Sequence, residues 1–232
     1  MPEQNAKTWK HLLWIPINAV LVFTLPYLLV SLMGFSRDSY YIWLYIFSIA
    51  FIGLYAKRSD FHWAASLKSG WALGVISGVF IGLVFLSLAA MSKPALGASF
   101  FSASILPFLW RGLFYGLASA ALVSVFPFVV VWRALSGINP GAFRKFGVTI
   151  VAILSIGLMS SLYNLGLSDL KRDNLGNQIG KSLIAAVPTI ISGSPLAAPI
   201  SNVLLQMSES VERGSLDGIQ TAKSKTAPGG IN

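Results

Sequence analysis

The chain has 232 residues, of which 55% are hydrophobic and 11% charged, with a mean hydropathy of +0.70. Soluble domains carry about 25% charged residues, so this composition is typical of a polytopic membrane protein. Cysteine is absent, which excludes disulfides, thiolate metal sites and cysteine nucleophiles. The only histidines, His11 and His62, cannot form a histidine metal cage within a bilayer. The sequence therefore indicates no metal and no cofactor.

The net charge of +9 does not indicate nucleic-acid binding. The basic residues are scattered in small groups between long apolar runs, as the positive-inside rule requires of a membrane protein. We therefore expect the lipid bilayer, and not a nucleic acid, to be the surroundings of this chain.

Five apolar runs are long enough to cross a bilayer as helices, which takes about 20 residues. The first exceeds the apolar core of a signal peptide, so we expect an uncleaved span, and Pro16 and Pro26 predict a bend in it. The second is short, but aromatic residues at its ends, Tyr40, Tyr41, Trp43 and Tyr55, are typical interfacial anchors. In chain order the runs are 12–33, 40–56, 71–91, about 108–132 and 147–167.

A sixth apolar region, 178–208, is interrupted by Ser192-Gly193-Ser194-Pro195 and again by Pro199. Irregular backbone at membrane depth is tolerated only inside protein or beside a water-filled cavity. The region predicts either one broken span or two short half-spans. The expected fold class is an all-α, polytopic transmembrane helical bundle of about six spans, with the last one broken.

The topology prediction rests on the basic residues. With six crossings, eleven of them fall on the side of the N-terminus and five on the other. This bias predicts a multi-pass protein of the cell membrane with both termini in the cytoplasm. Residues 1–11 form the cytoplasmic N-terminus, 12–213 the transmembrane domain and 214–232 a cytoplasmic tail, which we expect to be flexible because it is too polar to bury a core.

Glycines recur at four-residue spacing in the third and fourth spans. This spacing places small residues on one helix face and lets a neighbouring helix approach closely. It predicts internal helix packing or, alternatively, a homodimer face. The residues are Gly70, Gly74, Gly78 and Gly82 in the third span and Gly112 and Gly116 in the fourth.

Arg111 is the one charge deep within an apolar run, and no run holds a carboxylate in its interior. A lone arginine at the middle of a membrane helix costs roughly 2.5 kcal/mol or more and usually has a partner or a task. It either snorkels to the interface beside Trp110 or faces the bundle interior. In the second case its candidate partners are Asn164, Asn202 and Gln206, which together with Arg111 form a candidate polar site.

The stretch around Arg111 resembles the first motif of the CPBP family, the CAAX-prenyl and bacteriocin-processing intramembrane endopeptidases. That motif has two adjacent glutamates, three residues, an arginine and usually a glycine. Arg111 and Gly112 match it, whereas Leu106 and Pro107 occupy the glutamate positions. In the second motif of the family, Asn164 stands where a histidine is expected.

The third motif of the family, a histidine followed four residues later by asparagine or histidine, is similar in place and spacing to Asn202 and Gln206. The resemblance covers roughly residues 100–210 and implies a CPBP-like helical bundle. The family uses glutamate to activate water, with histidines assisting, and amides cannot act as general bases near neutral pH. The resemblance therefore implies a non-catalytic relative, and we expect no catalytic residues.

Three function hypotheses follow. The first is a non-catalytic binding or scaffold subunit for a membrane-protein partner, a second copy of the chain, a lipid or a pigment. The second is a small permease or the membrane subunit of a transporter, which the broken region favours because interrupted helices often line transport sites. The third is an intramembrane peptidase that uses a Ser/Lys arrangement with Lys181.

Overall fold

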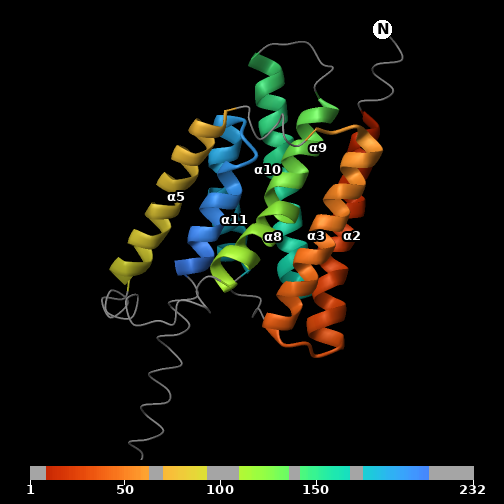
Figure 1. Ribbon diagram of the computed structural model, residues 1–232. Coiled ribbons are helices and arrows are strands. Elements are labelled where there is room, and N and C mark those ends of the chain that lie inside the picture. Colours follow the sequence, from red (N-terminus) through yellow and green to blue (C-terminus); the bar gives the residue numbers. More distant parts are fainter. Residues whose placement is uncertain (1–8, 63–69, 93–109, 136–141, 168–174, 209–232) are drawn as a thin grey trace, which may run out of the picture.

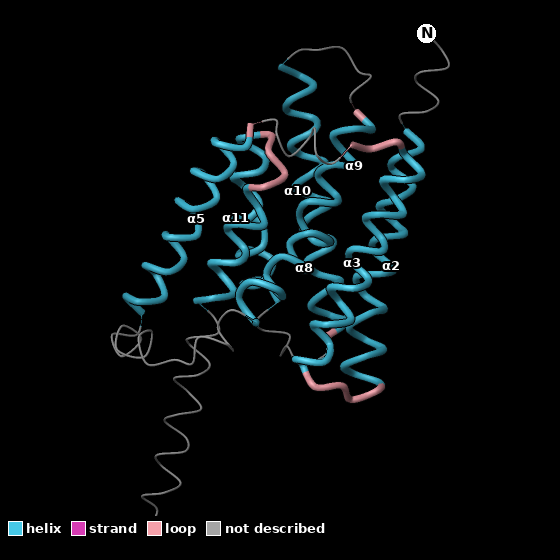
Figure 2. Tube along the Cα trace, viewed as in Figure 1, coloured by secondary structure: helices cyan, strands magenta, loops and turns pink. Residues whose placement is uncertain are grey.

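The computed structural model describes residues 9–62, 70–92, 110–135, 142–167 and 175–208 (Figure 1). These residues are helical apart from short turns, and no strand occurs among them. The helices run up and down along one direction (Figure 2). The predicted all-α bundle is thus confirmed, and five described helical segments are long and apolar enough to cross a membrane. Residues 1–8 and the predicted tail lie outside the described residues.

Each of the five segments coincides with a predicted span, and two of them are composed of several helix types. The first consists of η1 (Trp9–Leu13), α2 (Trp14–Pro26) and η2 (Tyr27–Leu32); the second is α3 (Arg37–Ser59) and the third α5 (Trp71–Ser92). The fourth consists of η3 (Trp110–Tyr115), α8 (Gly116–Ala120), η4 (Ala121–Val125) and α9 (Phe126–Ala134), and the fifth is α10 (Ala142–Gly166).

Pro26 marks a change of helix type in the first segment. Proline has no N–H to donate, so the α-helical bonding of α2 is interrupted at its end. The chain continues as the π-helix η2, whose wider turns are closed by bonds such as the one from the Met33 N–H to the Leu28 carbonyl at 2.9 Å. The end of α10 packs here, because the Ser31 hydroxyl donates to the Gly166 carbonyl at 3.0 Å.

The fourth segment forms the centre of the bundle. In its most apolar stretch 78% of the residues are buried, whereas the corresponding share in the other four segments is 17–44%. Asn18 of α2 is fully buried and donates its amide to the Leu122 carbonyl of η4 at 2.8 Å. This bond satisfies a backbone acceptor inside the core, where an unpaired carbonyl would cost about 1–3 kcal/mol.

The sixth region is a helical hairpin. α11 (Leu175–Ser192) ends at a turn, 193–196, and a second helix follows over residues 197–208. The Ala198 N–H donates to the Thr189 hydroxyl at 2.7 Å, and the Ser201 hydroxyl donates to the Ala185 carbonyl. Because the later residue of one helix pairs with the earlier residue of the other, the two helices are antiparallel. Of the two sequence-based alternatives, the structure shows two short helices and not one broken span.

This hairpin changes the basis of the topology prediction. Both termini were expected on one side because the region 178–208 was counted as a single crossing. Its two helices instead run in opposite directions, so the described chain begins with η1 at one end of the bundle and finishes with the helix over residues 197–208 at the opposite end (Figure 1).

The glycine stripe of α5 lies against the second helix of the hairpin. Among the α5 residues whose side chains are described, the buried ones are Gly74, Gly78 and Gly82. A Cβ atom at Gly78 would lie 2.7 Å from the Ala197 carbonyl oxygen, and one at Gly82 would lie 2.6 Å from the Leu204 Cβ. Real side chains do not approach so closely, so this contact exists only because both positions lack a Cβ.

Two further glycines lie close to the hairpin, Gly116 at its second helix and Gly70 at Ser192 and Ser194. A Cβ at Gly116 of α8 would lie 2.8 Å from the Val203 Cα, so α8 covers a different side of the helix. Gly70 precedes α5 with φ +65°, a conformation that favours glycine. The helix over residues 197–208 is therefore enclosed by α5, α8 and α11. The surroundings of Gly112 lie outside the described residues.

We expect Gly78→Ala to destabilise the protein by about 1–3 kcal/mol, because the added methyl group overpacks the contact with Ala197. The matched control is Gly53→Ala in α3, where nothing lies within 4 Å of the added Cβ. Loss of glycine flexibility there should stabilise α3 by up to about 1 kcal/mol. Thermal denaturation of both variants in detergent measures the difference, and equal melting temperatures would contradict close packing at Gly78.

Candidate functional site

The candidate polar site from the sequence is only partly within the described residues. Arg111 belongs to η3, but its side chain lies outside the description. Asn164 of α10 and Asn202 of the hairpin are both buried, and Gln206 is half-buried. Each asparagine bonds to its own helix: Asn164 donates to the Ser160 carbonyl at 2.8 Å, and Asn202 to the Ala198 carbonyl at 3.2 Å.

These hydrogen bonds limit what the two asparagines can do. Each bond uses one of the two amide N–H groups and ties the side chain to its own helix. Amides also lack the basicity to take a proton from water near neutral pH. In the described part of the chain, no group of three or more His, Asp or Glu residues is placed to hold a metal ion.

A cluster of buried tyrosines links three helical segments, and the sequence analysis missed it. The Tyr40 hydroxyl of α3 donates to the Tyr163 hydroxyl of α10 at 3.2 Å, and Tyr163 donates to Tyr115 of η3 at 2.9 Å. Tyr41 stacks on Tyr115 with ring centroids 4.2 Å apart. The three hydroxyls satisfy one another in the core, so the cluster joins α3, η3 and α10 where a single buried hydroxyl would be costly.

This cluster corrects the interpretation of the aromatic residues around the second span. Tyr40, Tyr41 and Tyr55 were predicted to be interfacial anchors, but all three are buried, whereas Trp43 is exposed as expected. Composition alone does not distinguish the two roles, because a tyrosine is suited both to an interface and to a hydrogen-bonded core. Contacts with distant parts of the sequence decide between them: Tyr163 meets Tyr40, whereas His11 and Phe126 meet Tyr55.

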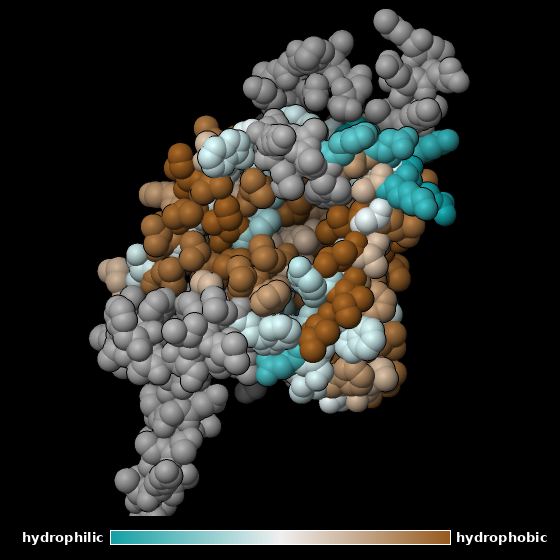
Figure 3. Space-filling view, viewed as in Figure 1, coloured by the Kyte–Doolittle hydropathy of each residue, from teal (hydrophilic) through white to brown (hydrophobic). Residues whose placement is uncertain are grey.

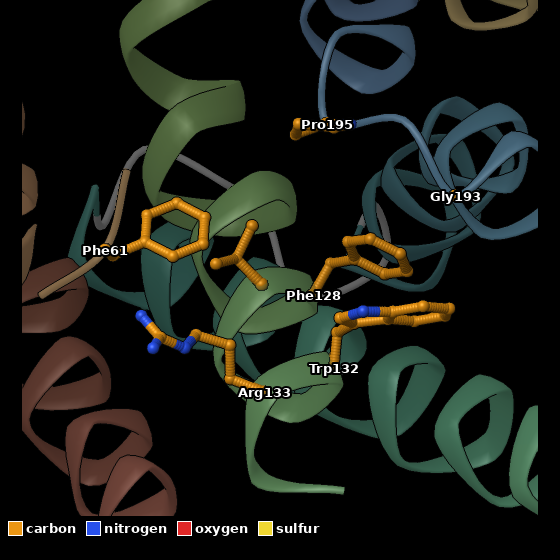
Figure 4. Close-up of a pocket in the computed structure, with 7 residues that line it drawn as sticks. Phe61, Phe128, Trp132, Arg133, Gly193 and Pro195 are labelled. Carbon is orange, nitrogen blue, oxygen red and sulfur yellow. The ribbon is translucent and has the colours of Figure 1, made fainter. Parts of the chain in front are cut away.

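A pocket of about 130 Å³ lies between α9 and the hairpin turn (Figure 4). Arg133 and Phe61 lie on one side of it, and Phe128 and Trp132 on the other. The turn contributes Pro195 and Gly193, and Val129 completes the lining. None of these side chains is a nucleophile or a general base, so the lining is suited to holding a group and not to reacting with it.

Among the described residues that line the pocket, Arg133 is the one that carries a charge. The central carbon of its guanidinium lies 5.1 Å from the centroid of the Phe61 ring, a cation–π geometry. The guanidinium also lies close enough to Tyr55 and His11 to interact with both. The Tyr55 hydroxyl and the His11 Nδ1 are in turn 3.3 Å apart. These neighbours fix the arginine where α3 ends and η1 begins.

The surface at this end of the bundle is more hydrophilic than the surface along its side. Figure 3 shows apolar residues over much of the side of the bundle and hydrophilic residues gathered at the end nearest the start of the chain. Lys10, Lys57 and Arg58 are exposed at this end. Together with Arg133 they outnumber Asp60, the exposed acid described at this end, so the described residues give it a net positive charge.

Comparison with known proteins does not place the chain in a family: no family model, no curated protein and no solved structure matches it. The resemblance to the CPBP family therefore stays a prediction.

We expect Tyr163→Phe to destabilise the protein by roughly 1–3 kcal/mol, because the fully buried Tyr40 hydroxyl loses its acceptor. The control is Tyr45→Phe, since Tyr45 is 38% exposed and packs on Phe114 through its ring, which the change preserves. Denaturation of both variants in detergent measures the two effects. A neutral Tyr163→Phe would show that the tyrosine hydroxyls do not join the helices.

Proposed function

We propose that this chain is a multi-pass integral membrane protein that binds a membrane component without transforming it chemically. The observation that carries the proposal is the pocket at Arg133, which combines a cation with aromatic walls and has no nucleophile or general base in its lining. Such a pocket provides recognition and lacks the groups for hydrolysis. In this role the helical bundle is the scaffold that positions the pocket.

The bonding of the two asparagines supports the non-catalytic part of the proposal. Asn164 and Asn202 stand where the CPBP resemblance expects histidines, and both donate to carbonyls of their own helices. We infer that these positions have a structural role in this chain. The proposal includes the CPBP family only in this respect: the chain would be a relative that lacks the catalytic groups.

A permease or transporter subunit is the second candidate, and the helical hairpin favours it. Interrupted helices in the membrane often line transport sites. Against it, the turn donors are already bonded: the Ser194 N–H donates to the Ser192 hydroxyl at 3.1 Å and the Leu196 N–H to the Ser194 hydroxyl at 3.4 Å. Ion or solute flux into proteoliposomes, faster than in protein-free vesicles, would favour the transporter.

The purified protein should cleave neither prenylated CAAX peptides nor model transmembrane substrates, because the acid and the histidine in the five described segments, Asp38 and His11, lie at the segment ends and not in their interior. Product formation is measured by mass spectrometry. Lys181→Ala is the control for the Ser/Lys alternative. Turnover by the wild type would overturn the proposal, and its loss in Lys181→Ala would assign the activity to the Ser/Lys arrangement.

We also propose that the end of the bundle with Lys10, Lys57 and Arg58 faces the cytoplasm, because these exposed basic residues lie directly at the ends of spans. The count over the whole chain does not decide the orientation, since the hairpin moves Arg213, Lys223 and Lys225 across and leaves eight basic residues on each side. The hairpin then directs the C-terminus to the opposite side. The absence of native cysteine allows single-cysteine labelling of His62→Cys, Met33→Cys and a cysteine appended after Asn232. An impermeant maleimide added outside intact cells should label the last two and not the first. Labelling that groups the C-terminus with His62→Cys would contradict the proposed topology.

A further inference from the structure

We propose that the pocket at Arg133 binds the phosphate of an anionic membrane lipid, with the guanidinium on the phosphate and the aromatic walls against the adjoining carbons. This inference rests on the proposed function, since it requires the chain to lie in a bilayer. The proposed function leaves the ligand unidentified, and this inference gives its chemical class.

The position of Arg133 along the chain suits a lipid headgroup. Arg133 is the last but one residue of the apolar stretch Leu113–Ala134, so it lies where a spanning helix would leave the hydrocarbon. Its neighbour Trp132 lines the same pocket and is 41% exposed. Tryptophan is enriched at this depth of the membrane. A ligand that meets both residues must present charge and apolar surface together, as a phospholipid does.

The chemistry of the arginine favours phosphate. A guanidinium presents a planar set of donors that matches two phosphate oxygens at once. The stacking of Arg133 on Phe61, at 5.1 Å, restricts the orientation of that plane and lowers the entropy lost on binding. Phe128 and Trp132 stand across the pocket from the guanidinium (Figure 4). The pocket is therefore charged on one wall and apolar on the other.

The size of the pocket excludes a large ligand. Pockets that enclose a drug-sized molecule measure about 300–1,000 Å³, and this one measures about 130 Å³. It can hold a phosphate and the atoms beside it, while the rest of a lipid extends along the outside of the bundle. A pigment, one of the ligands considered from the sequence, does not fit inside it.

The backbone of the hairpin turn does not provide an alternative anion site. The Ala197 N–H donates to the Ser194 carbonyl at 3.3 Å, and the Ala198 N–H donates to Thr189. With the Leu196 N–H bonded to the Ser194 side chain, the first donors of the helix over residues 197–208 are occupied. Among the described residues of the lining, Arg133 therefore supplies the positive charge that an anion would meet.

Lys10, Lys57 and Arg58 favour an anionic lipid over a zwitterionic one. They are exposed at the same end of the bundle as Arg133. Basic residues near a membrane surface attract anionic lipids over distances of about a Debye length. They concentrate such lipids near the pocket without lining it, which makes them suitable controls.

The test is a titration of the purified full-length protein in neutral detergent with phosphatidylglycerol, phosphatidylcholine or inorganic phosphate. Native mass spectrometry measures lipid binding, and thermal denaturation measures stabilisation. Both lipids carry the phosphate, but the choline cation of phosphatidylcholine is repelled by the basic residues at this end, so the wild type should bind phosphatidylglycerol more tightly. Arg133→Gln should weaken binding of phosphatidylglycerol at least tenfold, as expected for the loss of one charge-assisted hydrogen bond. Arg58→Gln removes an exposed charge outside the lining and should weaken that binding much less.

A second variant keeps the test decisive if Arg133→Gln does not fold. Val129→Phe adds atoms toward the pocket while leaving Arg133 in place, and the empty volume gives them room. It should weaken binding of phosphatidylglycerol as Arg133→Gln does.

Three results would overturn the inference. These are equal affinity of the wild type for the two lipids, equal losses in Arg133→Gln and Arg58→Gln, and inorganic phosphate that stabilises the protein as well as phosphatidylglycerol does. The last would identify a site for a free anion. None of these results would show peptidase activity, and peptidase activity is what would overturn the proposed function. Failure of the lipid inference is therefore distinguishable from failure of the proposed function.

Discussion

The close contact between the glycine stripe of α5 and the helix over residues 197–208 is the constraint on which the second half of the bundle depends. That helix is joined to α11 by the hydrogen bonds of the hairpin and packs against α5 and α8 through their glycines. Gly78 and Gly116 allow α5 and α8 to enclose it at distances that any larger side chain would prevent.

The same contact positions the pocket. Ser194 lies against Gly74, where an added Cβ would be 2.6 Å from the Ser194 Cβ, and its neighbours Gly193 and Pro195 line the pocket. Displacement of the hairpin from α5 would therefore move one wall of the pocket away from Arg133. Packing in the middle of the bundle and recognition at its end are thus parts of one arrangement.

Polar groups in the core serve to join helices. Asn18 satisfies a carbonyl of η4, Tyr163 connects the tyrosines of α3 and η3, and Ser201 ties the two helices of the hairpin. In an apolar environment such groups are costly unless paired, so each bond both removes a cost and fixes the position of a helix. These pairs explain how a chain with few charges fixes the positions of its apolar helices relative to one another.

The positions of the helices followed from the sequence, because each apolar run of about 20 residues is a local feature with a single solution in a membrane. The glycine spacing likewise indicated a packing face, since the helix period alone places Gly74, Gly78 and Gly82 on one side. The turn in the last apolar region was also visible in Gly193 and Pro195.

Tertiary structure decided the rest. The sequence left open whether the region 178–208 crosses once or folds back, because that depends on whether Thr189 and Ala185 meet residues of the second helix. It also placed Tyr40 at an interface, whereas contact with Tyr163, 123 positions away, buries it. The pocket had no sequence signal, since Phe61, Arg133 and Pro195 come from three distant segments. Local periodicity determined the helices of this protein, and only their mutual packing determined its polar contacts and its pocket.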